Sequence, residues 1–275
     1  MLPQLELIYW PIRGRAYPIL LLLKAARIPF TYTEVPFNRG DLCLDEWPFG
    51  ALPVLKVKSD DGETVIAEVS AILRYLEKVI GQELAVEQVQ PLPPLEQAHV
   101  DMVHSATLFN STMLYNSASS ATWLEGEQRA NLKRERVVPF LRGLEHQLTR
   151  AEFPREAALE PRALRNGGVL FSAAACAAAY TLSMVVDLFP YTLAHPLATH
   201  EAGAGGQRRA LEDQFPACAS VLRAVEGAPG FAEWVASGAR KERWSNWPSY
   251  TPENVRRTGE QYDREEAGKE ASEER

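Results

Sequence analysis

The 275-residue sequence predicts an α+β protein with two domains, a four-stranded mixed sheet with its helices and then an all-α helical domain. Before Gly81, short apolar runs alternate with helical patterns, which predicts the sheet domain. After Gly81 only long helical patterns follow, beyond a linker in which three of residues 91–94 are proline. We therefore expect domains over residues 1–82 and 95–240, with a partly disordered extension over 241–275.

Each element of the sheet domain has its own local signal. Four short segments are apolar or alternate in polarity and predict strands, and two longer ones predict helices. The strands are expected at Leu5–Trp10, Phe30–Val35, Leu52–Val57 and Glu63–Ala67, and the helices at Arg15–Arg27 and Glu68–Ile80. The turn signal at residues 60–62 makes the last two strands an antiparallel hairpin. The first two strands should be parallel and joined by a right-handed crossover, which gives the thioredoxin arrangement.

The second domain is predicted to be helical throughout, without paired strands. Five segments carry a helical repeat of apolar residues. They are Leu95–Ser117, Glu127–Ala151, Ser172–Leu188, Gly206–Val225 and Gly230–Ala239. A run of Ala and Gly at 202–206 predicts a flexible connection, and from Arg256 the mixed charges without apolar periodicity predict disorder.

Charge and composition argue against several classes of function. The formal net charge is −7 and we find no large basic patch, which argues against nucleic acid as a partner. We find no apolar stretch of the ~18–20 residues that span a bilayer, and no signal peptide, so we expect a cytoplasmic protein without membrane insertion. Cys43, Cys176 and Cys218 are too scattered for a disulfide framework or a metal site, and the last two are expected to be core thiols.

Three points along one edge of the predicted sheet suit ligand binding. The first strand ends at Tyr9, where thiol–disulfide chemistry would need a Cys-x-x-Cys motif and the sequence has no cysteine. Pro53 opens the third strand and is a candidate for a cis peptide that would offer backbone groups to an extended ligand. The last helix begins at Glu68, and its free N–H groups suit a carboxylate. Together they predict a groove for a small anionic, peptide-like ligand that brings its own thiol.

Three segments resemble the cytosolic glutathione transferases, most closely the tyrosine-type sigma, mu and pi classes. They are YWPIRGRA at residues 9–16, WPFGALPVL at 47–55 and AILRYL at 71–76. In the second domain, Val100–Val103 resembles the start of the family's fourth helix, and the stretch from Phe215 to Phe231 resembles its seventh and eighth. The likeness covers Leu5 to Ser237, and the order of the three motifs makes it specific.

The resemblance implies roles for residues at the thiol end of glutathione. Tyr9 would stabilise the thiolate, with Arg13 as a positive charge nearby. The backbone of Leu52, next to Pro53, would pair with the cysteinyl unit, and Trp47 would hold the glycine end. Each of these side chains also has a plainer interpretation as packing or as surface charge.

At the γ-glutamyl end, the resemblance assigns Glu68 to the ammonium group and Asp101 to a contact across the interface of a homodimer. Val69 departs from the family pattern, because it replaces a serine that binds the γ-glutamyl carboxylate. Ser70 lies about 100° further around the helix. Loss of that hydroxyl predicts an affinity roughly ten- to a hundred-fold lower, while the backbone N–H of Val69 remains.

Two further departures accompany Val69. Ala51 stands where pi-type relatives carry a glutamine that helps bind the ligand's main chain. Ala175 stands where a capping-box acid would follow Ser172, and one capping interaction is worth about 1 kcal/mol. These departures predict a partly altered site.

Two functions remain open at this point. The first is an enzyme that activates glutathione, as co-substrate, for conjugation to a hydrophobic electrophile or for its isomerisation, as in detoxification. A hydrogen bond from Tyr9 worth about 1.5–3 kcal/mol would lower a thiol pKa of ~8.5 by about one to two units. The second is a catalytically weak or inactive transferase-fold protein that serves in binding or assembly, which is favoured by Val69, Ala51 and the charged C-terminal extension. Phe109, Met113 and Tyr115 are expected either to line an electrophile pocket or to belong to the core.

Overall fold

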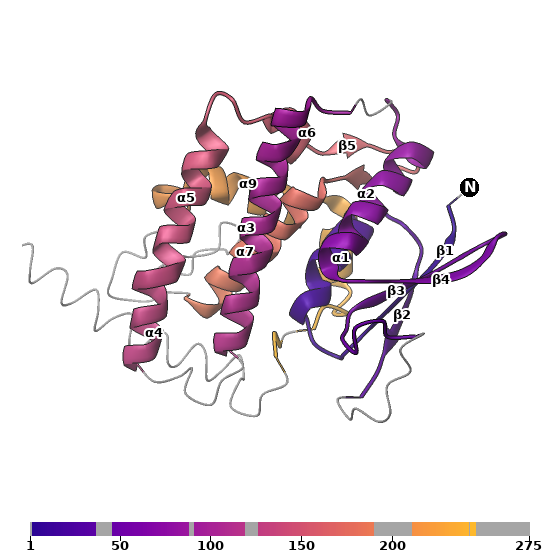
Figure 1. The fold of residues 1–275 in the computed structure, drawn as a ribbon, viewed down its shortest axis with the longest axis horizontal. Coiled ribbons are helices and arrows are strands. Elements are labelled where there is room, and N and C mark those ends of the chain that lie inside the picture. The colour runs from indigo at the N-terminus through magenta and orange to yellow at the C-terminus, as the bar shows by residue number, and fades with distance from the viewer. Residues whose placement is uncertain are drawn as a thin grey trace, which may run out of the picture.

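The computed structural model describes residues 2–36, 46–87, 91–118, 126–189, 211–241 and 243–245. The first domain holds a four-stranded sheet and two α-helices (Figure 1). Its elements are β1 (Gln4–Tyr9), a 3-10 turn (Gly14–Ala16), α1 (Tyr17–Ala25), β2 (Thr31–Glu34), β3 (Val54–Ser59), β4 (Gly62–Ala67) and α2 (Val69–Leu84). Cys43, the predicted flexible connection at 202–206 and the predicted disordered segment from Arg256 lie outside the described residues.

The strand order β2-β1-β3-β4 confirms the predicted mixed sheet. β1 runs parallel to β2 and antiparallel to β3, and β3 and β4 form the expected hairpin. Because Ile8 of β1 faces Val54 of β3, the end of β1 lies beside the start of β3. Tyr9 and the segment before Val54 therefore meet at one edge of the sheet.

The second domain is mostly helical. Its first long helix, α3 (Pro94–Ala118), crosses the front of the molecule in Figure 1. The remaining helices are α4 (Gly126–Leu132), a π-helical turn (Lys133–Val137), α5 (Val138–Thr149), α6 (Arg155–Leu159), α7 (Ala173–Leu188), α8 (Leu211–Gln214), α9 (Pro216–Glu226) and α10 (Pro229–Ala236). Both parts of the predicted fold class are thus confirmed.

Two predictions for the second domain are wrong in detail. The strands β5 (Arg162–Ala163) and β6 (Val169–Leu170) pair antiparallel, although no strands were predicted there. Their two residues each are too few to show an alternating pattern. The helix predicted over 206–225 is interrupted before Pro216, because proline has no N–H to continue α8 but fits the first turn of α9.

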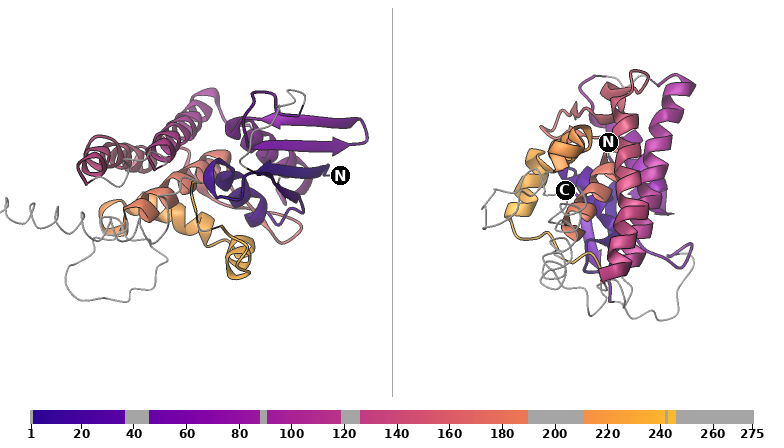
Figure 2. Two further views of the ribbon diagram at one scale, coloured as in Figure 1. Left: turned by 90° about the horizontal axis from the view of Figure 1, so that it is seen from below. Right: turned by 90° about the vertical axis from the view of Figure 1, so that its left-hand side faces the viewer.

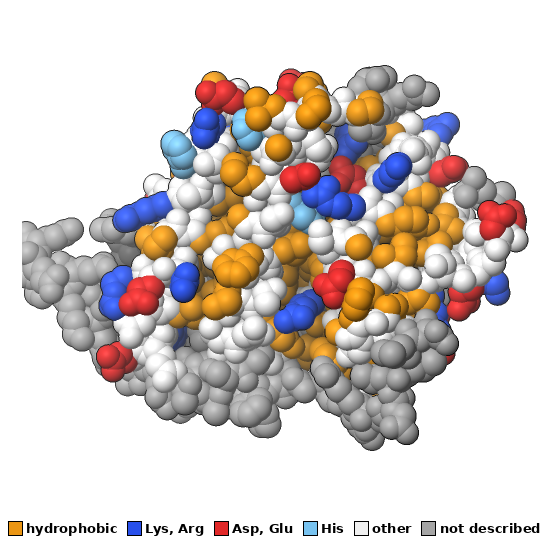
Figure 3. Space-filling model, viewed as in Figure 1, with side chains coloured by type: hydrophobic (Ala, Val, Ile, Leu, Met, Phe, Trp, Pro, Cys, Tyr) orange, Lys and Arg blue, Asp and Glu red, His pale blue; other side chains and the backbone are white. Residues whose placement is uncertain are grey.

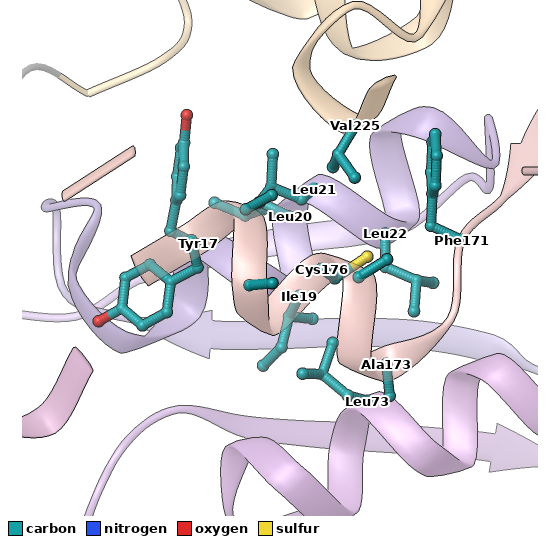
Figure 4. Packing of buried hydrophobic residues seen from close by; sticks show 14 of the residues in the cluster. Tyr17, Ile19, Leu20, Leu21, Leu22, Leu73, Phe171, Ala173, Cys176 and Val225 are labelled. Carbon is teal, nitrogen blue, oxygen red and sulfur yellow. The ribbon is translucent and has the colours of Figure 1, made fainter. Parts of the chain in front are cut away.

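The two domains pack around α1. Eight of its nine residues are buried, because α2 covers it on one side and α7, α9 and α10 on the other (Figure 2). Figure 4 shows the α1 side chains Leu21 and Leu22 among Leu73 of α2, Cys176 of α7 and Val225 of α9. Such an all-apolar helix is stable only when it is covered on every side.

The start of α7 supplies a polar tie between the domains. Ser172 caps the helix as predicted, since its Oγ accepts a hydrogen bond from the N–H of Ala175 at 3.0 Å. Ala175 has no acidic side chain to complete the capping box, but Glu77 of α2 binds the start of α7 instead. Its carboxylate accepts hydrogen bonds from the N–H of Ala173 at 2.9 Å and from Arg162 at 2.8 Å. A carboxylate at this position also complements the positive end of the helix dipole.

Candidate functional site

Tyr9 closes β1 and points its hydroxyl into the loop that follows. Its side chain has 0% exposure, and Oη accepts a hydrogen bond from the backbone N–H of Arg15 at 2.8 Å. Gly14 makes this contact possible. Its φ is +39°, and a Cβ there would lie 2.3 Å from the Tyr9 hydroxyl oxygen. Only glycine allows both this backbone conformation and this close approach.

The surroundings of Tyr9 keep its phenol protonated. Burial raises the pKa of Tyr9 well above its ordinary value, and the nearby Tyr115 and Tyr180 raise it further. The amide and the charge of Arg15 lower the pKa but do not outweigh burial. A phenol of this kind is a hydrogen-bond donor at neutral pH, and the amide on its oxygen polarises the O–H bond.

The two arginines of the loop have different environments. Arg13 is 6% exposed, and its guanidinium is bound by Asp187 of α7 at 2.5 Å. Arg15 lies beside Tyr9 instead, with its guanidinium carbon 5.6 Å from the centre of the Tyr115 ring. Sequence reasoning assigned the positive charge to Arg13 and passed over Arg15, although both stand in the same motif. Gly14, with its positive φ, lies between the two arginines.

The segment before β3 carries the next predicted residues. The Leu52–Pro53 peptide is cis, as the sequence suggested. Leu52 is buried, whereas Trp47 and Ala51 are half-buried. The Trp47 carbonyl accepts from the N–H of Gly50 at 2.8 Å, which closes a tight turn ahead of the strand. This segment therefore lies at the same sheet edge as Tyr9.

The start of α2 is open and strained. Glu68 is exposed and has φ +69° and ψ +123°, a sparsely populated conformation that persists mostly at functional sites. Its side chain makes no capping hydrogen bond, so the first N–H groups of α2 keep their capacity for an anion. Val69 is half-buried, and Ser70 turns away to bind Nε2 of His104 on α3 at 2.9 Å.

Asp101 lies on α3 opposite α2. Its carboxylate accepts hydrogen bonds from Arg74 at 2.7 Å and from Gln97 at 2.8 Å. Partial burial raises the pKa of Asp101, but these hydrogen bonds outweigh it and the net pKa is lowered. Asp101, Arg74 and His104 line a cavity of about 770 Å³, which is also bounded by the start of α7. The lining of this cavity does not include Tyr9.

Sequence comparisons point to one family. A model of the glutathione S-transferase N-terminal domain matches residues 16–79. Glutathione S-transferase P 1 of Xenopus laevis is 36% identical over 107 residues, which cover 38% of this chain and 45% of that protein. Glutathione S-transferase 1 of Ascaris suum is 35% identical over 109 residues, or 37% of this chain and 44% of that protein. The matched sequence thus spans less than half the length of these curated relatives.

A structural comparison covers most of the chain. The sigma-class glutathione S-transferase (GST) of Fasciola hepatica matches with a TM-score of 0.57 and 18% identity, over 86% of this chain and 96% of that one. At this identity, the match establishes the fold: a thioredoxin-like sheet domain followed by a helical domain.

Proposed function

We propose that this chain is a cytosolic glutathione transferase, which binds glutathione and activates its thiol for reaction with a hydrophobic electrophile. The observation that carries the proposal is the protonated Tyr9 hydroxyl, held by the Arg15 amide at the sheet edge where β3 begins. A neutral donor at this point stabilises a thiolate more than a thiol, because hydrogen bonds to charged acceptors are the stronger ones.

The proposed reaction begins when the bound thiol loses its proton to solvent. Tyr9 donates its O–H to the sulfur anion, and Arg15, whose guanidinium lies by Tyr115, supplies positive charge nearby. The sulfur lone pair then forms a C–S bond to the electrophilic carbon. The electron pair displaced from that carbon leaves with a leaving group, or forms an anion that takes a proton from solvent.

The remaining contacts fix the ligand's two ends. The backbone of Leu52, beside the cis peptide to Pro53, would pair with the cysteinyl unit, and Trp47 would contact the glycine end. The open N–H groups of α2, beginning at Val69, suit the γ-glutamyl carboxylate, and the exposed Glu68 suits the ammonium group. Without a serine hydroxyl at position 69, the carboxylate depends on these backbone groups.

A homodimer is the proposed assembly, and the surface of α3 supports it. Leu95, Met102 and Phe109 are exposed and spaced seven residues apart, so they share one face of the helix. Figure 3 shows apolar side chains along this side of the molecule. Asp101 lies next to this stripe on the same helix, and the proposed dimer would bring it close to a ligand in the partner subunit. Sedimentation analysis should give a dimer for the wild type and a monomer for Phe109→Glu combined with Met102→Glu.

Titration calorimetry with glutathione at neutral pH tests the proposed function. We expect a dissociation constant between micromolar and low millimolar, with release of a proton to the buffer as the thiol ionises. Turnover of a model aryl halide should then rise with pH through the depressed thiol pKa. No heat at several millimolar glutathione would contradict the proposal.

The second candidate is a transferase-fold protein that binds a partner without chemistry. Its specific support is the complete burial of Tyr9, together with the loss of a hydroxyl at Val69. A protein of this kind would bind glutathione without proton release, or not at all. Conjugation at an ordinary rate would exclude it.

A further inference from the structure

The last described residues of the chain, 239–241 and 243–245, form a strap that returns to the first domain. We call this segment the C-terminal strap. Lys241 forms an ion pair with Glu34 at the end of β2, at 2.8 Å. Arg240 donates to the hydroxyl of Tyr17 on α1 at 3.1 Å. The strap follows α10 and so ties the end of the helical domain to the sheet domain.

Arg13 is the residue to which the strap is fastened. Its backbone N–H donates to the carbonyl of Arg243 at 2.8 Å, and its Nε donates to the carbonyl of Lys241 at 2.5 Å. The guanidinium carbon lies 4.7 Å from the centre of the Trp244 ring. A planar guanidinium can make these contacts and an ion pair at once, which a lysine cannot.

Asp187 of α7 completes the arrangement from the helical domain. The same carboxylate oxygen accepts from Nη1 of Arg13 at 2.5 Å and from the indole N–H of Trp244 at 2.9 Å. Trp244 is 1% exposed and packs edge-on against Tyr17, with ring centres 5.0 Å apart. Arg13 and Trp244 are buried and Asp187 is half-buried, so the two buried donors depend on this carboxylate for their hydrogen bonds.

We propose that the C-terminal strap is part of the thiol-activating site, with Arg13, Asp187 and Trp244 as positioning residues that hold the Arg15 amide on the Tyr9 hydroxyl. The inference rests on the proposed function of Tyr9. Arg13 and Arg15 flank Gly14, which has a positive φ and, as a glycine, has no Cβ to restrict its backbone. With Arg13 fixed by the strap, rotation at Gly14 is restrained and the Arg15 N–H stays directed at Tyr9.

Two conservative variants of the full-length protein test this. Asp187→Asn keeps the shape but removes the charge that faces Arg13, and Trp244→Phe keeps one aromatic ring but removes the part of the indole that carries the N–H. The matched control is Glu233→Gln, which removes the exposed ion pair between Arg27 after α1 and α10 without touching the strap.

Amide hydrogen exchange measures how often the loop after β1 opens, whether or not glutathione binds. We expect the amides of Arg13 and Arg15 to exchange about tenfold faster in both strap variants than in the control, because each loses a restraint on local opening. Equal exchange in all three proteins would overturn the proposal. If the wild type binds no glutathione, the proposed function fails while this measurement still decides whether the strap holds the loop.

The pH profile of turnover separates positioning from general stability. A weaker bond from Arg15 to Tyr9 raises the pKa of the bound thiol, so kcat in the strap variants should fall about three- to tenfold at pH 6.5 and recover at high pH. A rise in the KM for glutathione with an unchanged pH profile would contradict the proposal, because it would mean that the strap affects binding alone.

Discussion

The two ends of the proposed glutathione site are built in opposite ways. At the thiol end, the loop after β1 is held by Asp187, by the C-terminal strap and by the contact of Tyr9 with Arg15. At the γ-glutamyl end, the start of α2 is exposed at Glu68 and makes no side-chain capping bond there. One end is fixed by many contacts, and the other begins at an exposed residue without a side-chain cap.

The difference predicts which property of the proposed site each end controls. A donor whose position is fixed in a buried environment gives a strong, directed hydrogen bond. Backbone N–H groups at a helix start attract any carboxylate, with less geometric selection. We therefore expect the thiol end to govern turnover and the γ-glutamyl end to govern affinity.

The largest expected effect comes from Tyr9→Phe, which removes the donor at the thiol end. The bound thiol should lose about 1.5–3 kcal/mol of stabilisation of its anion, so its pKa should rise by about one to two units. Turnover at pH 6.5 should fall roughly ten- to a hundred-fold, measured with saturating glutathione.

The matched control for Tyr9→Phe is Tyr32→Phe. Tyr32 belongs to the neighbouring strand β2, and its hydroxyl donates to the carbonyl of Trp10 at 3.3 Å. We expect that variant to turn over like the wild type. Equal losses of turnover in the two variants would indicate damage to the sheet, and would contradict a specific role of the thiol end in turnover.

The sequence predicts the sheet domain well, because its signals are local. The apolar runs, the turn at Gly62 and the proline at position 53 lead to the observed strand order and to the cis peptide. The short strands β5 and β6 are not predictable in this way, since each has only two residues and carries no alternating pattern. The chain between them turns at Gly167, which has a positive φ.

The sequence predicts which residues belong to the candidate site, but it does not predict which of them contact one another. The motif contains Tyr9, Arg13 and Arg15, but nothing in it indicates which arginine stays beside the tyrosine. That choice depends on Asp187 and on Trp244, which lie more than 170 and 220 residues away in the sequence. Long-range pairing of this kind has no local signal.

An intermediate effect is expected at the γ-glutamyl end, from Val69→Ser. The new hydroxyl would stand at the first residue of α2, next to N–H groups that are open to a carboxylate. A hydrogen bond to a charged group contributes about 1.5 kcal/mol or more, so glutathione should bind roughly tenfold more tightly by calorimetry. Turnover at saturation should stay nearly constant.

The control for Val69→Ser is Ala71→Ser, which adds a hydroxyl to an exposed position two residues further along α2. It should leave the affinity unchanged. An unchanged affinity in Val69→Ser itself would mean that the γ-glutamyl carboxylate binds elsewhere. The start of α2 would then not be the end of the site that governs affinity.

The smallest expected effect concerns His104, which fastens the start of α2 to α3 through Ser70. Burial, aided by the charge of Arg74, lowers the pKa of His104 below its ordinary value, although the backbone at Ala173 and Asp101 act in the opposite sense. The unfolded chain therefore takes up a proton near pH 6.5 that the folded chain resists.

The direction of the pH dependence follows from that difference. Stability is fully present above pH ~6.5 and decreases as the pH falls below it, by at most about 1.4 kcal/mol per pH unit. In His104→Gln, urea unfolding at pH 7 and pH 5.5 should show a loss smaller than in the wild type by about 1 kcal/mol. His146→Gln, at an exposed position on α5, should keep the wild-type loss. Equal losses of unfolding free energy in all three proteins would mean that the contact of α2 with α3 through Ser70 does not depend on a neutral His104.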